Sequence, residues 1–331
     1  MSIENFIKNL EIAPATSHLN LMMHPLVSRS YAEPNYLMLD DALQTGRFRV
    51  EEVSFGGSVP ELKVLNDLSQ PVLLLDGEEL VGAKQNRVLN LTIMVPAASE
   101  VAIPVSCVEA GRWSHVSDSF AAADRAQFAR GRAKKLAQVS HSLRAAGSRN
   151  SDQADVWNEI EMKRARMGTE SPTSAMASLY EDSRVRLNEF IAAMPNTEGQ
   201  VGAVFLINGQ IAGIDIFDTA PAFAKSAAKL IRSYAIDALD SPRESVADEL
   251  GIKTARTFLN DIAAVNCTSF KAIGIGDDVR FSGQNLGGAA LQIAGRIIHL
   301  VAFPNKLLAD GHRHDARPGR MARARIRRSY H

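Results

Sequence analysis

Residues 201–217 read VGAVFLINGQIAGIDIF, two apolar runs joined by Asn208 and Gly209. Asn-Gly supplies the two positive φ angles of a type I′ turn, whose twist matches that of the flanking strands. The stretch therefore predicts a β-hairpin. The residues that follow, Ala220 to Leu239 and then Ser245 to Val265, have the apolar spacing of two amphipathic helices.

A similar stretch recurs further along the chain. GAVFLINGQIAGIDIF begins at Gly202 and GAALQIAGRIIHLVAF begins at Gly288, and six of the 16 aligned positions are identical. Two hairpins of one sheet can converge on such packing, and an ancient duplication would also explain it. In both cases we expect the hairpins to lie in one sheet that is covered by the helices between them.

Upstream of this region the sequence changes character twice. Between Phe48 and Glu109, short apolar runs such as ELKVLN, VLLL and RVLNLTIMV alternate with turn signals, which is typical of an antiparallel sandwich or barrel. Between Asp118 and Met194, helix-forming residues predominate and predict at least three helices. We expect breaks between these helices near residues 147–151 and 168–172, where glycine and polar residues gather.

These patterns predict an α+β fold in four parts. Residues 1–117 form a β-rich, sandwich-like part that carries polar motifs, and residues 118–198 form a helical segment. Residues 199–304 form an α+β part in which the two similar hairpins build an antiparallel sheet covered by helices. Residues 305–331 form a basic, disordered tail, because eight Lys or Arg residues and only two Asp follow position 305.

Composition limits the possible partners and compartments. The 331 residues carry no formal net charge, with a pI near 7.1, so the field of the whole molecule does not favour nucleic acid or an anionic membrane. Only two cysteines are present, which fits reduced thiols in a cytoplasm. No signal-peptide pattern and no apolar run of about 18–20 residues is found. We therefore expect a cytoplasmic protein without a membrane partner.

One polar cluster lies in LLLDGEELVGAKQNRVLN, residues 73–90, where both charge signs and two amides follow an apolar strand. Neighbours on a strand point to opposite faces, so one glutamate can face a pocket while the other faces solvent. Arginine clamps a phosphate or carboxylate, and amides bind a sugar hydroxyl or a base edge. A solvated polar hairpin is the alternative interpretation. The candidates are Glu78 and Glu79 as catalytic groups, and Lys84, Gln85, Asn86 and Arg87 as ligand-binding groups.

A second cluster lies in IPVSCVEAGRW, residues 103–113. Cys107 and Glu109 share one face of the predicted strand. Glu109 can join Glu78 or Glu79 as an acid–base pair or as ligands of a divalent cation. Cys107 is a candidate nucleophile if a cation lowers its pKa, and otherwise a small core residue. Beyond the strand, Arg112 is a candidate ligand-binding cation, and Trp113 can stack on a base or fill the core. We predict that Glu79, Arg87 and Glu109 converge in one pocket.

Two weaker signals lie in the third part of the chain. Asp215 stands in the apolar arm of the first hairpin, where a carboxylate is costly unless it is paired or at an edge. Asp277, Asp278 and Arg280 follow Gly276 at a strand end and form either a second polar edge or a turn. No P-loop, HExxH, GxSxG or paired CxxC motif is present in the sequence.

Taken together, these motifs are similar to those of a known family. PVLLLDGEELVGAKQNRVLN, IPVSCVEAGRW, VGAVFLINGQIAGIDIF and KLIRSYAIDAL resemble the bacterial ADP-ribosylglycohydrolase- and rhodanese-phosphatase-associated protein domain, over about Leu10 to Phe303. The resemblance implies a role near NAD-derived nucleotides, in stress or phage conflict. It supplies no catalytic residues. The polar residues that match its wording are Glu78, Glu79, Gln85, Asn86, Arg87, Cys107, Glu109 and Trp113.

Three functions remain open at this point. The chain is an enzyme, or a pocket, that acts on a nucleotide or an ADP-ribose-like phosphorylated metabolite, with or without a divalent cation. Alternatively, the same pocket is a non-catalytic sensor that relays ligand binding to a protein partner. A third possibility is that the arginine-rich tail associates with nucleic acid, which predicts binding that weakens strongly with salt.

Overall fold

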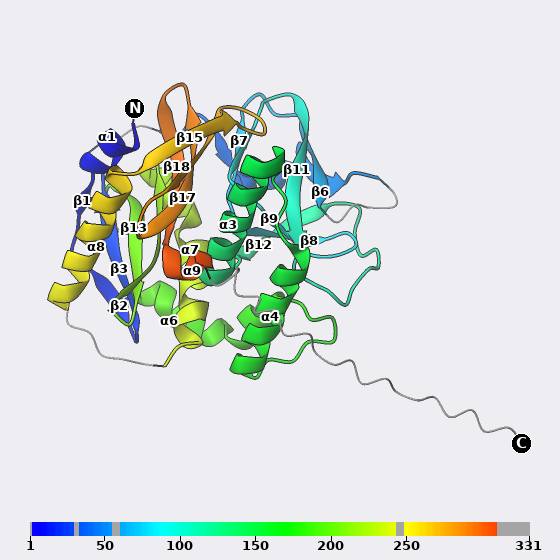
Figure 1. Cartoon of the computed structure of the whole chain (residues 1–331). Coiled ribbons are helices and arrows are strands. Elements are labelled where there is room, and N and C mark those ends of the chain that lie inside the picture. The colour runs from blue at the N-terminus through cyan, green and yellow to red at the C-terminus, as the bar shows by residue number, and fades with distance from the viewer. Residues whose placement is uncertain (1, 30–32, 55–59, 243–247, 310–331) are drawn as a thin grey trace, which may run out of the picture.

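The computed structural model describes residues 2–29, 33–54, 60–242 and 248–309 (Figure 1). A large sheet that contains the C-terminal strands lies on the left of the view, and most of the N-terminal strands lie on the right. Helix α3 (Ala129–Ala146) runs between these two regions. The predicted α+β fold is confirmed, including a strand-rich N-terminal part and a C-terminal antiparallel sheet.

The large sheet has nine strands in the order β1-β3-β13-β14-β18-β17-β16-β15, with β2 also paired to β3. Every pairing in it is antiparallel. Its strands are β1 (Glu11–Ile12), β2 (Thr16–His18), β3 (Leu21–Val27), β13 (Gln200–Ile207), β14 (Gln210–Phe217), β15 (Asn266–Lys271), β16 (Asp277–Ser282), β17 (Leu286–Ile293) and β18 (Arg296–Pro304).

The two similar stretches form neighbouring hairpins of this sheet, as the sequence predicts. Asn208 and Gly209 have φ angles of 51° and 70° and join β13 to β14, while Ala294 and Gly295 take the same left-handed conformation between β17 and β18. Strand β14 pairs with β18, so the two hairpins meet at the middle of the sheet. The buried carboxylate of Asp215 lies on this central pair, directly opposite Val301.

Helices cover both faces of the large sheet. Alternate residues of β13 point to opposite sides, so Phe205 packs with α7 (Ala220–Leu239) and α3, whereas Val204 packs with α1 (Ile3–Lys8) and α8 (Asp248–Ala263). Two hydrophobic cores therefore lie on either side of one sheet. The central strands are buried almost throughout because neither face is open to water.

The N-terminal strands form two further sheets around a third core. A six-stranded antiparallel sheet has the order β12-β8-β9-β11-β6-β5, and a three-stranded sheet has the order β10-β7-β4, in which β4 is parallel to β7. The strands are β4 (Leu37–Met38), β5 (Phe48–Glu52), β6 (Glu61–Asn66), β7 (Val72–Leu74), β8 (Glu78–Gly82), β9 (Arg87–Leu89), β10 (Ile93–Val95), β11 (Ser99–Cys107) and β12 (Phe120–Ala126).

The segment predicted to be helical begins with a strand, because β12 pairs with β8 before α3 starts. The expected helix breaks are confirmed: α3 and α4 end at Gly147 and Gly168, both in the left-handed conformation that glycine adopts easily. The remaining helices are α2 (Leu39–Gln44), α4 (Gln153–Met167), α5 (Ala177–Asp182), α6 (Arg184–Ala193) and α9 (Asn305–Ala309).

Two of the predicted boundaries are crossed by these elements. Strands β1, β2 and β3 belong to the sheet built mainly by residues 199–304, because β3 pairs with β13 along its whole length. The first residues of the predicted tail form helix α9, which ends at Ala309. The rest of that predicted tail, 310–331, lies outside the described residues. Among the helices that are described, none is long and apolar enough to cross a membrane.

Candidate functional site

The stretch 73–90 sends its polar side chains to two separate places. Strand β8 begins with Glu78 and Glu79, which point to opposite faces as neighbours on a strand must. Both are buried, with exposed fractions of 3% and 0%, so the expectation that one would face solvent is wrong. A buried carboxylate needs a cation or hydrogen-bond donors, and each of the two has its own set.

Glu78 faces the large sheet and its helices. Its Oε1 lies 2.9 Å from Nζ of Lys229 on α7, which also pairs with Asp40, and its Oε2 accepts a hydrogen bond from the backbone N–H of Leu75. These contacts join the N-terminal strands to α7. Glu78 therefore lies apart from the cluster that the other predicted site residues form.

Glu79 faces the opposite way. Its Oε2 lies 2.5 Å from Nε of Arg125 on β12, and its Oε1 accepts a hydrogen bond from the side-chain amide of Asn86 at 3.3 Å. Burial raises the pKa of Glu79, and the nearby Arg125 and Asn86 only partly oppose this. The surroundings of Glu79 therefore favour its protonated form more than water does.

Glu109 belongs to the same network through Asn86. Its Oε2 accepts from Nε of Arg112 at 2.8 Å and from the backbone N–H of Asn86, and its Oε1 accepts from the hydroxyl of Thr173. Nη2 of Arg112 also donates to Oδ1 of Asn86, at 2.9 Å. Asn86 thus connects the Glu79–Arg125 pair to the Glu109–Arg112 pair.

Arg87 has the most unusual surroundings among the predicted residues. Its side chain is fully buried, with 0% exposed, yet only Nη1 has a hydrogen-bond acceptor, Oε1 of Gln85 at 2.9 Å. Nε and Nη2 have no oxygen acceptor, and the sulfur of Cys107 lies beside the guanidinium. Burial lowers the pKa of Arg87, with Cys107 and Glu52 opposing this electrostatically. Gln85 in turn donates to the backbone carbonyl of Glu109, so Arg87 is tied to the same network.

Trp113 lies at the solvent side of this arginine, with 50% of its surface exposed. The guanidinium carbon of Arg87 is 5.7 Å from the centre of the indole ring, and Nζ of Lys84 is 5.4 Å from it. Both distances are within the range of a cation–π interaction. The ring is therefore a partly exposed aromatic surface beside two cations.

Cys107 is buried on β11, directly opposite Arg87 on β9. Burial raises the pKa of its thiol, with the backbone of Glu109 and the charge of Arg87 opposing, so the neutral thiol is favoured. Its backbone exchanges two hydrogen bonds with the amide of Gln153 on α4. The indole of Trp157 on α4 lies near the thiol and also partly opposes the raised pKa of Cys107.

We call Gln85, Arg87, Cys107, Glu109 and Trp113 the Arg87 centre. The structure brings these residues together with Glu79, Asn86 and Arg112, but Arg87 pairs with neither Glu79 nor Glu109. Each of the three predicted carboxylates faces a cation instead of another carboxylate. Among the described residues, no group of three or more His, Cys, Asp or Glu side chains is placed to hold a metal ion.

A second buried cluster was not predicted from the sequence. Arg132 on α3 makes a two-pronged ion pair with Asp215 on β14, at 2.6 and 3.1 Å, and its Nε lies 3.2 Å from Oδ2 of Asp76. Tyr234 on α7 donates to Asp215 at 2.8 Å. Burial lowers the pKa of Arg132, but the two aspartates outweigh this and raise it. The cluster joins α3 and α7 to Asp215 in the large sheet and to Asp76, which lies between β7 and β8 of the N-terminal strands.

Two more side chains complete this cluster. Nζ of Lys135 lies 3.2 Å from Oδ1 of Asp76, and Nε2 of His299 lies 3.3 Å from Oδ1 of Asp215. Nδ1 of His299 is 2.9 Å from the hydroxyl of Thr92, which accepts the backbone N–H of Asp76. We call Asp76, Arg132, Lys135, Asp215 and His299 the Arg132 centre.

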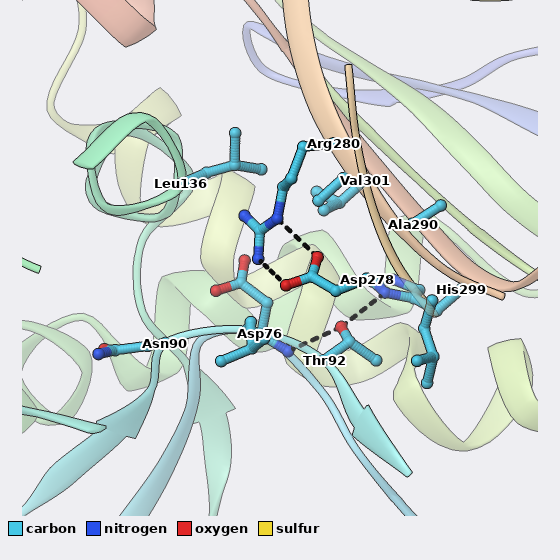
Figure 2. A pocket seen from close by; sticks show the side chains of 12 residues that line it. Asp76, Asn90, Thr92, Leu136, Asp278, Arg280, Ala290, His299 and Val301 are labelled. Carbon is cyan, nitrogen blue, oxygen red and sulfur yellow. Dashed lines mark hydrogen bonds and ion pairs between the residues drawn. The ribbon is translucent and has the colours of Figure 1, made fainter. Parts of the chain in front are cut away.

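Figure 2 shows the small cavity beside this centre. Its volume is about 20 Å³, which has room for about one water molecule and not for a metabolite. Arg280 and Asp278, two residues apart on β16, form an ion pair in its wall, at 2.6 Å, so the sequence stretch interpreted as a polar edge or a turn supplies a buried pair. The lining includes Asp76, Asn90, Thr92, Leu136, Asp278, Arg280, Ala290, His299 and Val301.

Comparison with known proteins gives one match. The family model described as ARPP-1, the ARG and Rhodanese-Phosphatase-superfamily-associated Protein domain, matches residues 9–303. No curated protein and no solved structure matches the chain. The match includes every residue of the Arg87 centre and of the Arg132 centre.

Proposed function

The chain belongs to the ARPP-1 family, and we propose that its Arg87 centre binds a phosphorylated, nucleotide-like metabolite. The observation that carries this proposal is the fully buried guanidinium of Arg87, with two nitrogens that have no oxygen acceptor. Leaving a charged donor buried and unpaired costs free energy. A phosphate oxygen at these nitrogens would remove that cost.

The groups around Arg87 fit the other parts of such a ligand. Arginine binds a phosphate through two parallel hydrogen bonds, and Nε and Nη2 form one edge of the guanidinium fork. Lys84 adds a second positive charge close to Trp113. The half-exposed indole offers a flat surface on which a base can stack. In this proposal the ligand enters past Trp113, because that ring lies between Arg87 and solvent.

A binding module is the form of the proposal that the geometry supports best. Glu79 and Glu109 are each committed to an arginine, and neither has a free oxygen beside a second carboxylate. A hydrolytic enzyme is the second candidate. It is favoured by the raised pKa of Glu79, because a carboxyl group whose pKa is shifted by burial is a frequent general acid.

A thermal-shift screen tests ligand binding. The panel contains ADP-ribose, NAD, common nucleotides and sugar phosphates, each with and without magnesium or manganese. A ligand present at 100 times its dissociation constant stabilises the folded state by about 2.7 kcal/mol. We expect a nucleotide-like hit that is lost in Arg87→Ala and kept in Arg49→Ala, a partly exposed arginine on β5. A hit that Arg87→Ala retains would contradict the proposed site.

A turnover assay then separates the two candidates. With the ligand identified by the screen, an enzyme converts it, and Glu79→Gln abolishes conversion while binding persists. A binding module leaves the ligand unchanged in both wild type and variant. The assay is followed by chromatography of the ligand, because this detects a product without assuming the reaction.

A further inference from the structure

The small cavity beside the Arg132 centre is lined by polar side chains, and most of them already have hydrogen-bond partners. The hydroxyl of Thr92 contacts Nδ1 of His299 and accepts the backbone N–H of Asp76. The side-chain amide of Asn90 donates one hydrogen bond and accepts another. Both carboxylate oxygens of Asp278 accept hydrogen bonds. Two other charged groups of the lining are less completely paired.

These two groups are Asp76 and Arg280, which are almost wholly buried, with 3% and 2% exposed. Oδ1 of Asp76 lies 3.2 Å from Nζ of Lys135 but accepts no hydrogen bond, although a carboxylate oxygen can accept from more than one donor. Of the N–H groups of Arg280, Asp278 accepts two and the hydroxyl of Ser140 accepts one. Each terminal nitrogen of Arg280 therefore keeps one N–H without an acceptor among the described residues.

The two incompletely paired groups point toward each other. Figure 2 shows the carboxylate of Asp76 directed at the guanidinium of Arg280. They form no direct ion pair, because within the described part of the chain Asp76 pairs with Arg132 and Lys135, and Arg280 pairs with Asp278. The cavity that both of them line measures about 20 Å³, and a cavity needs about 10–15 Å³ to hold a water molecule.

We propose that this cavity binds one water molecule, which donates a hydrogen bond to Oδ1 of Asp76 and accepts one from a terminal nitrogen of Arg280. Water suits the site because it is a donor and an acceptor at once. An anion would face the carboxylate and a cation would face the guanidinium, so both are disfavoured. The water-mediated ion pair joins the end of β7 to β16, and so connects the N-terminal strands to the large sheet. This site is independent of the function proposed for the Arg87 centre.

A crystal structure of the full chain, grown in the presence of sodium bromide, tests the site directly. We expect one water molecule within hydrogen-bond distance of both Asp76 and Arg280, and no anomalous bromide peak in the cavity. A bromide peak would identify an anion site. A direct contact between the two side chains would leave no space for water, and a cavity without density would have no ligand. Each of these three results overturns the proposal.

Methyl NMR tests the same site in solution. Ala290 lines the cavity, whereas Ala302 is a buried alanine of the same sheet that does not line it. With alanine methyl groups labelled, we expect a nuclear Overhauser effect from water to Ala290 and none to Ala302. Arg280→Met should abolish the effect, while Arg149→Met, which removes the other arginine bound to Asp278, should keep it. Absence of the effect in wild type overturns the water site, and its persistence in Arg280→Met overturns the role of Arg280 as the donor.

Discussion

Arg87 and Arg132 are both fully buried, but the protein treats them differently. Arg132 contacts Asp215 and Asp76, with Tyr234 completing the set, so nearly all of its charge is neutralised within the fold. Arg87 has a single neutral acceptor, the amide of Gln85. The comparison teaches that burial alone does not identify a functional charge. A buried charge whose partners are missing is the better indication of a ligand site.

The electrostatics of the two centres also differ: what separates them is whether neighbouring charges outweigh the effect of burial on the pKa. At the Arg132 centre burial raises the pKa of Asp215, but Arg132 and His299 outweigh it and hold that pKa well below its usual range. Near the Arg87 centre, Arg125 and Asn86 do not outweigh burial, and the pKa of Glu79 is raised. The surroundings of Asp215 and Arg132 thus favour their charged forms, whereas burial shifts the pKa values of Glu79 and Arg87 in the opposite sense.

The largest expected effect on the unfolding free energy comes from replacing Arg132. Arg132→Met leaves Asp215 and Asp76 buried with fewer cations, and breaking a buried ion pair in this way costs about 3–5 kcal/mol. Urea unfolding at pH 7, followed by circular dichroism, measures the loss. Arg166→Met is the control, since Arg166 is more exposed and its pair with Asp240 should contribute about 1 kcal/mol or less. Equal losses in the two variants would contradict the structural role of Arg132.

A smaller effect, with a defined pH dependence, is expected at Asp215. Its folded-state pKa lies below that of the unfolded chain, about 3.9, so its stabilising contribution is present above that pH and is lost as the pH falls below it. Asp215→Asn should therefore lower the unfolding free energy by about 2–3 kcal/mol at pH 7. The difference from wild type should shrink toward pH 3. A difference that is constant between pH 7 and pH 3 would show that the charge of Asp215 is not the cause.

The sequence predicts the Arg87 centre far better than the Arg132 centre, for a physical reason. Arg87 begins β9 and Cys107 ends the neighbouring β11, while Gln85 and Glu109 each lie two residues away along the chain, so the period of two that strands impose already groups them. This spacing is local in the sequence, so it can be recognised without knowing the fold.

Long-range pairing explains what the sequence did not reveal. Arg132 and Asp215 are separated by 83 residues, and Arg132 stands in ARGRAKKLAQ, which has the composition of a solvated helix. Asp215 was marked as costly in an apolar strand, which correctly indicated a need for a partner but not which one. In the same way, the pairing of β3 with β13 depends on how distant segments pack, and no local pattern in 1–117 indicates it.

Replacing Arg87 should have a much smaller effect on stability than replacing Arg132. Arg87→Met removes a buried charge that makes one hydrogen bond, and an apolar side chain of similar length can pack in its place. We expect the unfolding free energy to change by about 1 kcal/mol or less, or to increase. The same urea titration used for Arg132→Met measures it. A loss as large as that of Arg132→Met would remove the distinction between the two centres.

The smallest expected change in stability is at Trp113, because half of the ring is already in water and little packing is lost on truncation. Trp113→Ala should alter the unfolding free energy by about 0.5 kcal/mol or less. Its effect on nucleotide affinity should be larger, since stacking of a base on an aromatic ring contributes about 1–3 kcal/mol, or roughly 5- to 150-fold in the dissociation constant. Val116→Ala, an exposed residue of the same loop, serves as the control and should change neither quantity. An unchanged affinity in Trp113→Ala, measured by calorimetry with the ligand that Arg87 requires, would show that the ring only covers the arginine and does not stack on the ligand.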